Sequence, residues 1–220
     1  MRKLFEIGGL VAAAVLIAFG IGSIAMSVDG RSTVRDSLKL EQIVGTADMT
    51  PEAIAAEAKA AGLTGIDLPT KSVAGQKIDT GDRARTFASY MRVHALEATG
   101  GLTYAQMGRY LAKEGAPAKA TDGHGATNDP QYALTDPKTQ RPVENGARNT
   151  WVTETALSTA LNVSFMAEQL ALFGLVVGIA LLLAGIGFAV LAIGGALRNP
   201  DTTLTIFRRN DRRMTATPTA

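Results

Sequence analysis

The sequence contains no cysteine, only two histidines and few aromatic residues, which make up 5% of its 220 positions. Without cysteine the chain forms no disulfide, no thiolate metal site and no cysteine nucleophile. Phosphate-binding loops, dinucleotide-binding fingerprints and the GxSxG turn of serine hydrolases are also absent. The sequence therefore offers no motif that indicates catalysis.

Charge is missing from two long segments, and this is the strongest pattern in the chain. Residues 7–28 and 169–197 contain no Asp, Glu, Lys or Arg. Each segment exceeds the roughly 18 apolar residues that suggest a transmembrane helix. We therefore expect an all-α membrane protein whose two transmembrane helices, residues 7–28 and 167–197, form a hairpin. A mainly helical exterior domain, residues 29–166, is expected between them, and this organisation excludes a soluble enzyme.

The charges outside these segments are unevenly divided. The short flanks, residues 1–6 and 198–220, together carry a formal charge of +4, whereas residues 29–166 carry −1. Because positively charged short flanks stay on the cytoplasmic side, we expect a plasma-membrane protein with both termini cytoplasmic and residues 29–166 outside. The isoelectric point near 9.0 then reflects the flanks, so a nucleic-acid partner is not expected.

The first apolar segment has a second interpretation, a cleaved secretory signal. Arg2 and Lys3, the apolar run and the sequence Ser23-Ile24-Ala25 fit a signal with a small-x-small cleavage site. The run is about 22 residues long, which is longer than an ordinary signal core. A retained transmembrane helix is therefore the preferred interpretation, and a mature chain that begins at Met26 would contradict it.

Helical patterns recur between the two spans. Residues 32–41 are amphipathic and prolong the first span. Thr50 stands before a proline and has the form of an N-cap, which predicts a helix that ends at Gly62. Apolar residues at helical spacing predict a second helix over residues 82–98 and a shorter one over residues 103–113. Strand signals are few and allow a short hairpin at most. They lie near Val73, Ile78 and Val143.

Proline and glycine are frequent in residues 115–150, where no periodicity is visible. We expect a long loop there, which is either a plain surface loop or a lid or binding loop. From Thr150 to Phe173 the chain contains neither glycine nor proline. This predicts one helix of nearly fifty residues that begins at about residue 150 and continues into the second span, with Trp151 in the core of the domain.

Small residues recur in both spans at the spacing that close helix packing requires. Gly174 and Gly178 form a GxxxG step, and Gly185 follows one heptad later. In the first span the small residues lie four apart, at Ala14, Ala18 and Gly22. We expect the two spans to pack as a close hairpin. The alternatives are an oligomer contact and the general frequency of glycine in membrane helices.

Neither span carries a central ionisable residue, so an ion pathway or proton relay is not expected. Glu6 and Glu168 are expected at opposite ends of the hairpin, within reach of water. The tail, residues 198–220, contains a cluster of arginines that we expect to lie against anionic lipid headgroups, with a cytoplasmic protein partner as the alternative. The cluster consists of Arg208, Arg209, Arg212 and Arg213.

The two histidines are His94 and His124, and a mononuclear iron site of two histidines and one carboxylate would need both. His94 lies on an apolar helix face close to Met91, which predicts a packed core histidine. His124 lies between two glycines in the long loop and is a poor rigid ligand. We therefore predict no catalytic residue, no cofactor and no metal site.

Five blocks of the chain carry a family pattern, namely residues 2–5, 30–38, 43–51, 90–101 and 151–162. On these blocks, which span nearly the whole chain, it resembles a family of two-span membrane proteins from actinobacteria, often automatically labelled aromatic ring-opening dioxygenase. The resemblance implies location and architecture, because the family has no established activity. It also implies a missing disulfide, since this chain has Lys71 and Thr86 where members carry cysteines. The dioxygenase label conflicts with the two dispersed histidines.

Together these patterns favour a noncatalytic function. We expect a membrane-anchored accessory subunit, scaffold or oligomer-forming protein that presents an exterior helical domain at the cell envelope. Its expected partners are the lipid bilayer and further copies of the chain or a larger membrane complex. The alternative is a ligand-binding sensor or a metal-dependent dioxygenase-like enzyme that uses the exterior domain and its long loop.

Overall fold

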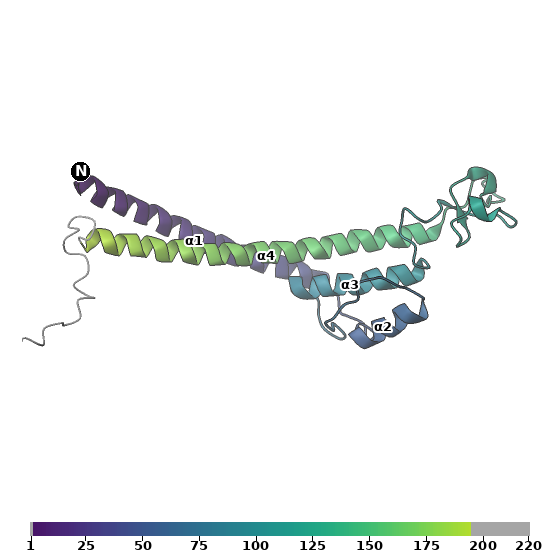
Figure 1. The fold of residues 1–220 in the computed structure, drawn as a ribbon, viewed down its shortest axis with the longest axis horizontal. Coiled ribbons are helices and arrows are strands. Elements are labelled where there is room, and N and C mark those ends of the chain that lie inside the picture. The colour runs from purple at the N-terminus through teal and green to yellow at the C-terminus, as the bar shows by residue number, and fades with distance from the viewer. Residues whose placement is uncertain (1, 195–220) are drawn as a thin grey trace, which may run out of the picture. The chain divides into compact units, whose positions relative to one another are not determined.

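The computed structural model describes residues 2–194, which are mostly helical (Figure 1). The helices in this range are α1 (Arg2–Leu40), α2 (Pro51–Ala60), α3 (Gly81–Ala98) and α4 (Gly146–Ile193). Two short strands, β1 (Tyr110–Leu111) and β2 (Ala126–Thr127), and two 3-10 turns, η1 (Ala118–Ala120) and η2 (Pro130–Tyr132), lie between α3 and α4. The predicted arginine cluster, Arg208, Arg209, Arg212 and Arg213, lies outside the described residues.

The chain divides into two compact units. The first unit contains residues up to Asp29 and residues from Ala171 onward, and the second contains Gly30–Leu170. Both α1 and α4 are long and apolar enough to cross a membrane. The expected single long helix is confirmed, because α4 runs for 48 residues without interruption and begins at Gly146, slightly before the predicted start.

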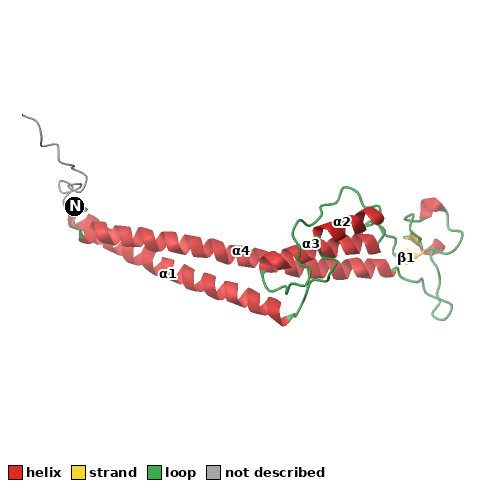
Figure 2. Cartoon of the chain, turned by 90° about the horizontal axis from the view of Figure 1, so that it is seen from below, coloured by secondary structure: helices red, strands yellow, loops and turns green. Residues whose placement is uncertain are grey.

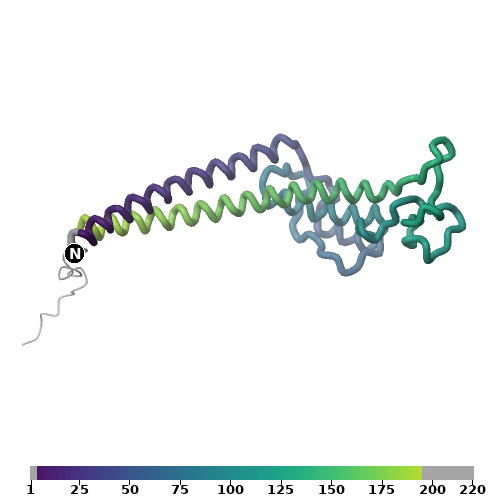
Figure 3. The backbone as a smooth tube through the Cα atoms, turned by 90° about the horizontal axis from the view of Figure 1, so that it is seen from above, coloured from purple at the N-terminus to yellow at the C-terminus, as the bar shows by residue number. Residues whose placement is uncertain are grey.

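In the first unit, the N-terminal part of α1 and the C-terminal part of α4 lie side by side and run in opposite directions (Figure 3). The backbones approach so closely that added side-chain atoms would collide. A Cβ at Gly178 would lie 2.8 Å from Cγ1 of Ile24 and 3.0 Å from the carbonyl oxygen of Gly20. A Cβ at Gly185 would lie 2.9 Å from the backbone nitrogen of Ile17. The structure thus places these glycines at the contact between the helices.

The predicted contact face of α1 is wrong. Ala14 and Ala18 are exposed, and a Cβ at Gly22 would meet no atom within 4 Å. The residues of α1 that face α4 include Ala13, Ile17, Gly20, Ile24 and Ser27. Steps of three and four residues alternate along this face, because two helices that cross at a small angle meet along a seam with a 3.5-residue period. The predicted residues are spaced strictly four apart, so successive members rotate around α1 and away from the contact line.

The core of the second unit lies where α2 and α3 pack together (Figure 1). Ile54 of α2 and Tyr90 and Val93 of α3 are almost completely buried, and Leu161 of α4 joins the same cluster. The predicted N-cap is confirmed, since the Thr50 side chain accepts a hydrogen bond from the backbone of Ala53. The predicted helix over residues 82–98 is also confirmed and begins one residue earlier.

A second apolar cluster surrounds Trp151, the only tryptophan in the chain. Trp151 is 6% exposed and packs with Ala95, Leu96 and Met107. The prediction that this residue belongs to the core of the domain is confirmed. The first turns of α4 are therefore fixed by packing against α3 and the segment that follows it.

The predicted helix over residues 103–113 is wrong. Thr103 begins a single turn, closed by a hydrogen bond from the backbone of Met107, and Tyr110–Leu111 then forms β1, which pairs with antiparallel β2 (Figure 2). Gly108 explains the difference, because a Cβ at this position would collide with the backbone nitrogen of Thr127. The close approach of two backbones outweighs the local helical pattern.

Before α4 begins, residues 115–150 contain no regular element other than the short 3-10 helices η1 and η2 and the strand β2, as expected of a loop. They are more ordered than the sequence suggested, because backbone bridges join Tyr110 to Glu144, Ala112 to Ala133 and Thr135 to Pro142. The strand signals near Val73 and Ile78 also form only isolated bridges, with partners at Val44 and Gly45.

Candidate functional site

One cluster in the second unit combines a histidine with several carboxylates. Nδ1 of His94 lies 2.6 Å from Oε1 of Glu57, and Nε2 of the same ring lies 3.3 Å from Oδ2 of Asp48. The His94 and Glu57 side chains are 27% and 21% exposed, and that of Asp48 is 48% exposed. The imidazole therefore lies between two carboxylates, within reach of water.

The local fold explains how these three side chains meet. Glu57 lies on α2, one turn after the buried Ile54, and His94 follows the buried Val93 on α3. Asp48 belongs to the turn before α2, where Met49 is buried in the core. Packing of the apolar faces of α2 and α3 brings polar residues at the border of these faces together.

Hydrogen bonds and charges shift the pKa values in this cluster. A hydrogen bond from the Thr46 hydroxyl holds the pKa of Asp48 below its ordinary value, and the nearby His94 acts in the same direction. A hydrogen bond with the Glu57 carboxylate raises the pKa of Glu97, which lies on the turn of α3 after His94. In residues 2–194 no lysine or arginine forms an ion pair with Asp48, Glu57 or Glu97.

The structure does not bring the two histidines together in a metal-ligand group. The one group of potential metal ligands in the described part of the chain consists of Asp48, Glu57 and His94, whose ligand atoms lie within 4.8 Å of one another. His124 lies elsewhere, with Nδ1 only 2.6 Å from where a Cβ at Gly100 would be. The expectation of a packed core histidine missed both carboxylates at His94. No local spacing could reveal them, because Glu57 and His94 are 37 positions apart.

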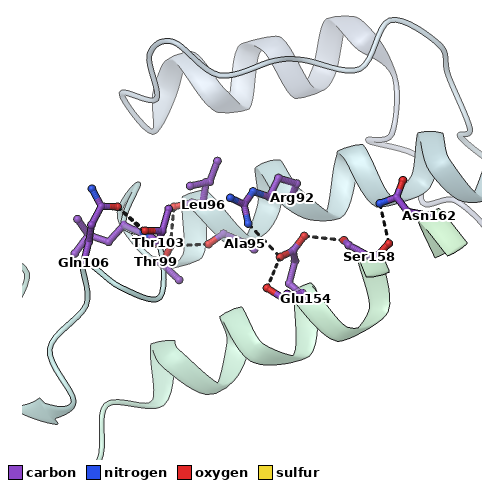
Figure 4. A network of polar contacts seen from close by, with 11 residues as sticks. Arg92, Ala95, Leu96, Thr99, Thr103, Gln106, Glu154, Ser158 and Asn162 are labelled. Carbon is purple, nitrogen blue, oxygen red and sulfur yellow. Dashed lines mark hydrogen bonds and ion pairs between the residues drawn. The ribbon is translucent and has the colours of Figure 1, made fainter. Parts of the chain in front are cut away.

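A second polar cluster joins α3 to α4 around Glu154, which is 3% exposed (Figure 4). Its carboxylate accepts a hydrogen bond from Ser158 at 2.7 Å and lies 3.5 Å from the Arg92 guanidinium. The same guanidinium lies over the Trp151 ring, 4.0 Å from its centroid. The arginine thus covers an aromatic face and neutralises a buried carboxylate at once.

A third cluster surrounds Glu168, which is 7% exposed. The expectation that Glu168 reaches water is therefore wrong. Its carboxylate accepts hydrogen bonds from Arg31 at 2.9 Å and from the backbone of Gly81, at the start of α3, at 2.6 Å. Arg35 completes the cluster, with Nη2 2.7 Å from the carboxylate. This carboxylate holds α1, α3 and α4 together within the second unit.

A shallow cavity of about 350 Å³ lies beside α3. Its polar lining includes Lys71 and Asp82, which form an ion pair of 2.9 Å, together with Arg85 and Thr86. Lys71 and Thr86 thus line the same cavity. Comparison of the chain with protein-family models, curated proteins and solved structures gives no match.

Proposed function

We propose that the chain is a two-pass plasma-membrane protein that presents residues 29–166 outside the cell as a noncatalytic helical domain. The observation that carries the proposal is the continuity of α4. Its first turns contribute Trp151 and Leu161 to the cores of the second unit, and its last turns are apolar and exposed. One helix thus supplies both a candidate membrane span and part of the core of the second unit, which supports a membrane-anchored domain.

The exposed side chains of the first unit support membrane insertion. The large apolar residues on its surface are 42–80% exposed. Together they expose more apolar surface than a protein in water normally does. In α1 they include Leu4, Phe5, Leu10, Val11, Phe19 and Ile21. In lipid the same surface carries no penalty, because hydrocarbon replaces water around it.

The noncatalytic assignment is supported by how the buried carboxylates are used. Glu154 and Glu168 are both buried, and both are paired with arginines from another helix. Carboxylates engaged in this way are satisfied structural groups, and the cavity of about 330 Å³ that Glu154 lines is shallow and open.

The proposed topology is testable because the chain contains no cysteine. Single cysteines are introduced as Thr139→Cys in the exterior domain and as Thr217→Cys in the tail. A membrane-impermeant maleimide should label the first variant in intact cells and the second only after permeabilisation. Equal labelling of both variants in intact cells would contradict the proposal.

The proposed hairpin is testable by a disulfide. The Cβ of Ser27 lies 3.8 Å from where a Cβ at Gly174 would be, which is close to the mean Cβ separation of about 3.8 Å in disulfides. The double variant Ser27→Cys/Gly174→Cys should therefore form an intramolecular disulfide in native membranes. The matched control is Gly22→Cys/Gly174→Cys, because Gly22 has no neighbour within 4 Å. A disulfide of equal yield in the control would contradict the hairpin.

The proposed partners are further copies of the chain or the members of a larger membrane complex. Blue-native electrophoresis of mild detergent extracts, followed by mass spectrometry of the migrating band, identifies either. A scaffold or accessory subunit should migrate above the mass of one chain with its detergent. A lone monomer without companions would contradict this part of the proposal.

A further inference from the structure

The cluster at His94 has the composition of a metal site of mixed nitrogen and oxygen ligands. One imidazole and two carboxylates converge from three segments, with their ligand atoms within 4.8 Å of one another. Imidazole nitrogen suits Zn²⁺ and related transition metals, whereas Ca²⁺ and Mg²⁺ take oxygen ligands. The presence of His94 therefore distinguishes this cluster from an acidic patch.

The two sides of the imidazole differ in geometry. Nδ1 lies 2.6 Å from the Glu57 carboxylate, which is a short hydrogen bond. In the tautomer that carries the proton on Nδ1, the ring donates to Glu57 and the lone pair of Nε2 faces Asp48. A carboxylate that orients a metal-ligating histidine through its other ring nitrogen is a common arrangement in zinc sites. Glu57 thus acts as a positioning residue.

On the other side of the ring, the distance to the second carboxylate fits a shared ion. Nε2 of His94 lies 3.3 Å from Oδ2 of Asp48. Bonds of about 2.0–2.2 Å to a tetrahedral ion place neighbouring ligand atoms roughly 3.3–3.6 Å apart. The observed separation matches one edge of such a tetrahedron. Asp48 is half exposed, so water can complete the coordination.

The charge of the cluster favours a cation. Asp48, Glu57 and Glu97 surround a single imidazole, and no lysine or arginine forms an ion pair with any of the three in residues 2–194. By contrast, the buried carboxylates of Glu154 and Glu168 both have arginine partners. A divalent ion would supply the missing positive charge.

We propose that Nε2 of His94 and the carboxylate of Asp48 bind a divalent transition-metal ion of the Zn²⁺ class, with Glu57 orienting the imidazole. The ion joins the turn before α2 to α3. This site is independent of the proposed scaffold function, because it lies within the exterior domain and needs no partner chain.

The test is a zinc titration of the purified full-length chain in detergent, after removal of metal by a chelator. Competition with a chromophoric chelator measures affinity and stoichiometry. The native chain should bind one Zn²⁺ ion. His94→Ala and Asp48→Asn should each bind at least about 100-fold more weakly, since each removes a direct ligand. Glu57→Gln should weaken binding by about 10-fold, the lower range for partners of a ligating histidine.

The matched control is His124→Ala, which removes the other histidine of the chain and should leave zinc affinity unchanged. Circular dichroism and thermal unfolding establish that each variant is folded, and Asp48→Asn changes a half-exposed side chain that the core does not need. The proposal is overturned if the native chain binds no Zn²⁺, if either direct-ligand variant keeps native affinity, or if His124→Ala weakens binding as His94→Ala does.

Discussion

The two units of this molecule use the same two helices, α1 and α4, but hold them together by different interactions. In the first unit the glycines of α4 lie against the backbone and the side chains of α1, with one hydrogen bond from Ser23 to the carbonyl of Gly174. In the second unit the buried carboxylate of Glu168 on α4 pairs with Arg31 and Arg35 of α1. The same helix therefore changes its packing chemistry along its length.

This difference is the one expected if the first unit lies in lipid and the second in water, as proposed above. In lipid the hydrophobic effect does not drive helices together, so close backbone approach and van der Waals contact must suffice. In water the burial of apolar side chains supplies the main stabilisation, and a few buried charges can be retained if they are paired. The long arginine side chains of the second unit reach both a buried carboxylate and the solvent.

The largest expected effect breaks the first kind of contact. In Gly178→Leu the new Cβ alone would lie 3.0 Å from the carbonyl oxygen of Gly20 and 3.0 Å from the backbone nitrogen of Ile24. Backbone atoms cannot rotate away, so the helices must separate, at a cost of about 3 kcal/mol, the upper range for overpacking. The measurement is the yield of the Ser27→Cys/Gly174→Cys disulfide, together with protein level in membranes.

Gly187→Leu is the matched control, because a Cβ at Gly187 would meet no atom within 4 Å. It lies on the same helix and makes the same chemical change. An equal loss of disulfide in both variants would show that leucine itself is harmful at this depth, and that the glycine contact is not special.

A smaller effect is expected for the paired charges of the second unit. Glu154→Ala removes the carboxylate that accepts hydrogen bonds from Ser158 and Arg92. The variant leaves buried polar groups without partners, which should lower the free energy of unfolding by about 2 kcal/mol. This loss is smaller than for a fully buried ion pair, because the Arg92 side chain is 46% exposed and can turn to water. Thermal unfolding followed by Trp151 fluorescence measures the loss. The control is the exposed Glu144→Ala, whose free energy of unfolding should lie within about 0.5 kcal/mol of that of the native chain. A similar loss of stability in both variants would contradict a special contribution of Glu154.

The helices of both units were predictable because their signals are local. The N-cap at Thr50, the apolar spacing in α3 and the absence of helix breakers from Thr150 onward each act within a few turns. The failed predictions depended on contacts between distant segments. The approach of Gly108 to Thr127 replaced the predicted helix over residues 103–113 with a strand.

The polar clusters were not predictable for the same reason. His94 meets Glu57 across 37 positions, Arg92 meets Glu154 across 62, and Arg31 meets Glu168 across 137. A single sequence contains no signal that connects such residues. The sequence predicted correctly that small residues of α1 lie at the contact with α4, but it did not predict which ones. That choice depends on the angle at which the two helices cross.

Acid should affect the second unit through Asp122, which lies in the loop of residues 115–150. Burial alone would raise the pKa of Asp122, but N–H groups of Gly108, Ala126 and His124 donate to its carboxylate and hold the pKa below the ordinary 3.8. Because the folded state lowers this pKa, its stabilisation is present above about pH 4 and is lost as the pH falls further. Asp122→Asn should cost about 1.5 kcal/mol at pH 7.

The sign of this effect gives its own control. The difference in unfolding free energy between native chain and Asp122→Asn should shrink as the pH falls below about 4, because protonation removes the charge that the N–H groups stabilise. Chemical denaturation at pH 7 and at pH 3 measures it. A difference that stays constant would show that geometry, and not charge, stabilises the segment.

The smallest expected effect concerns the start of α2. The Thr50 hydroxyl accepts a hydrogen bond of 3.2 Å from the backbone of Ala53 and satisfies one of the free N–H groups at the helix terminus. Thr50→Ala should therefore cost about 1 kcal/mol, whereas the exposed Thr64→Ala should cost almost nothing. Thermal unfolding of the two variants tests this.

The same variant tests what positions Glu57, which also lies on α2. Fraying of the first turn in Thr50→Ala should leave the contact between Glu57 and His94 intact, because the buried Ile54 and Ala58 hold α2 in the core. Loss of cap stability without loss of zinc affinity would then show that tertiary packing, and not the local helix signal, positions the cluster at His94.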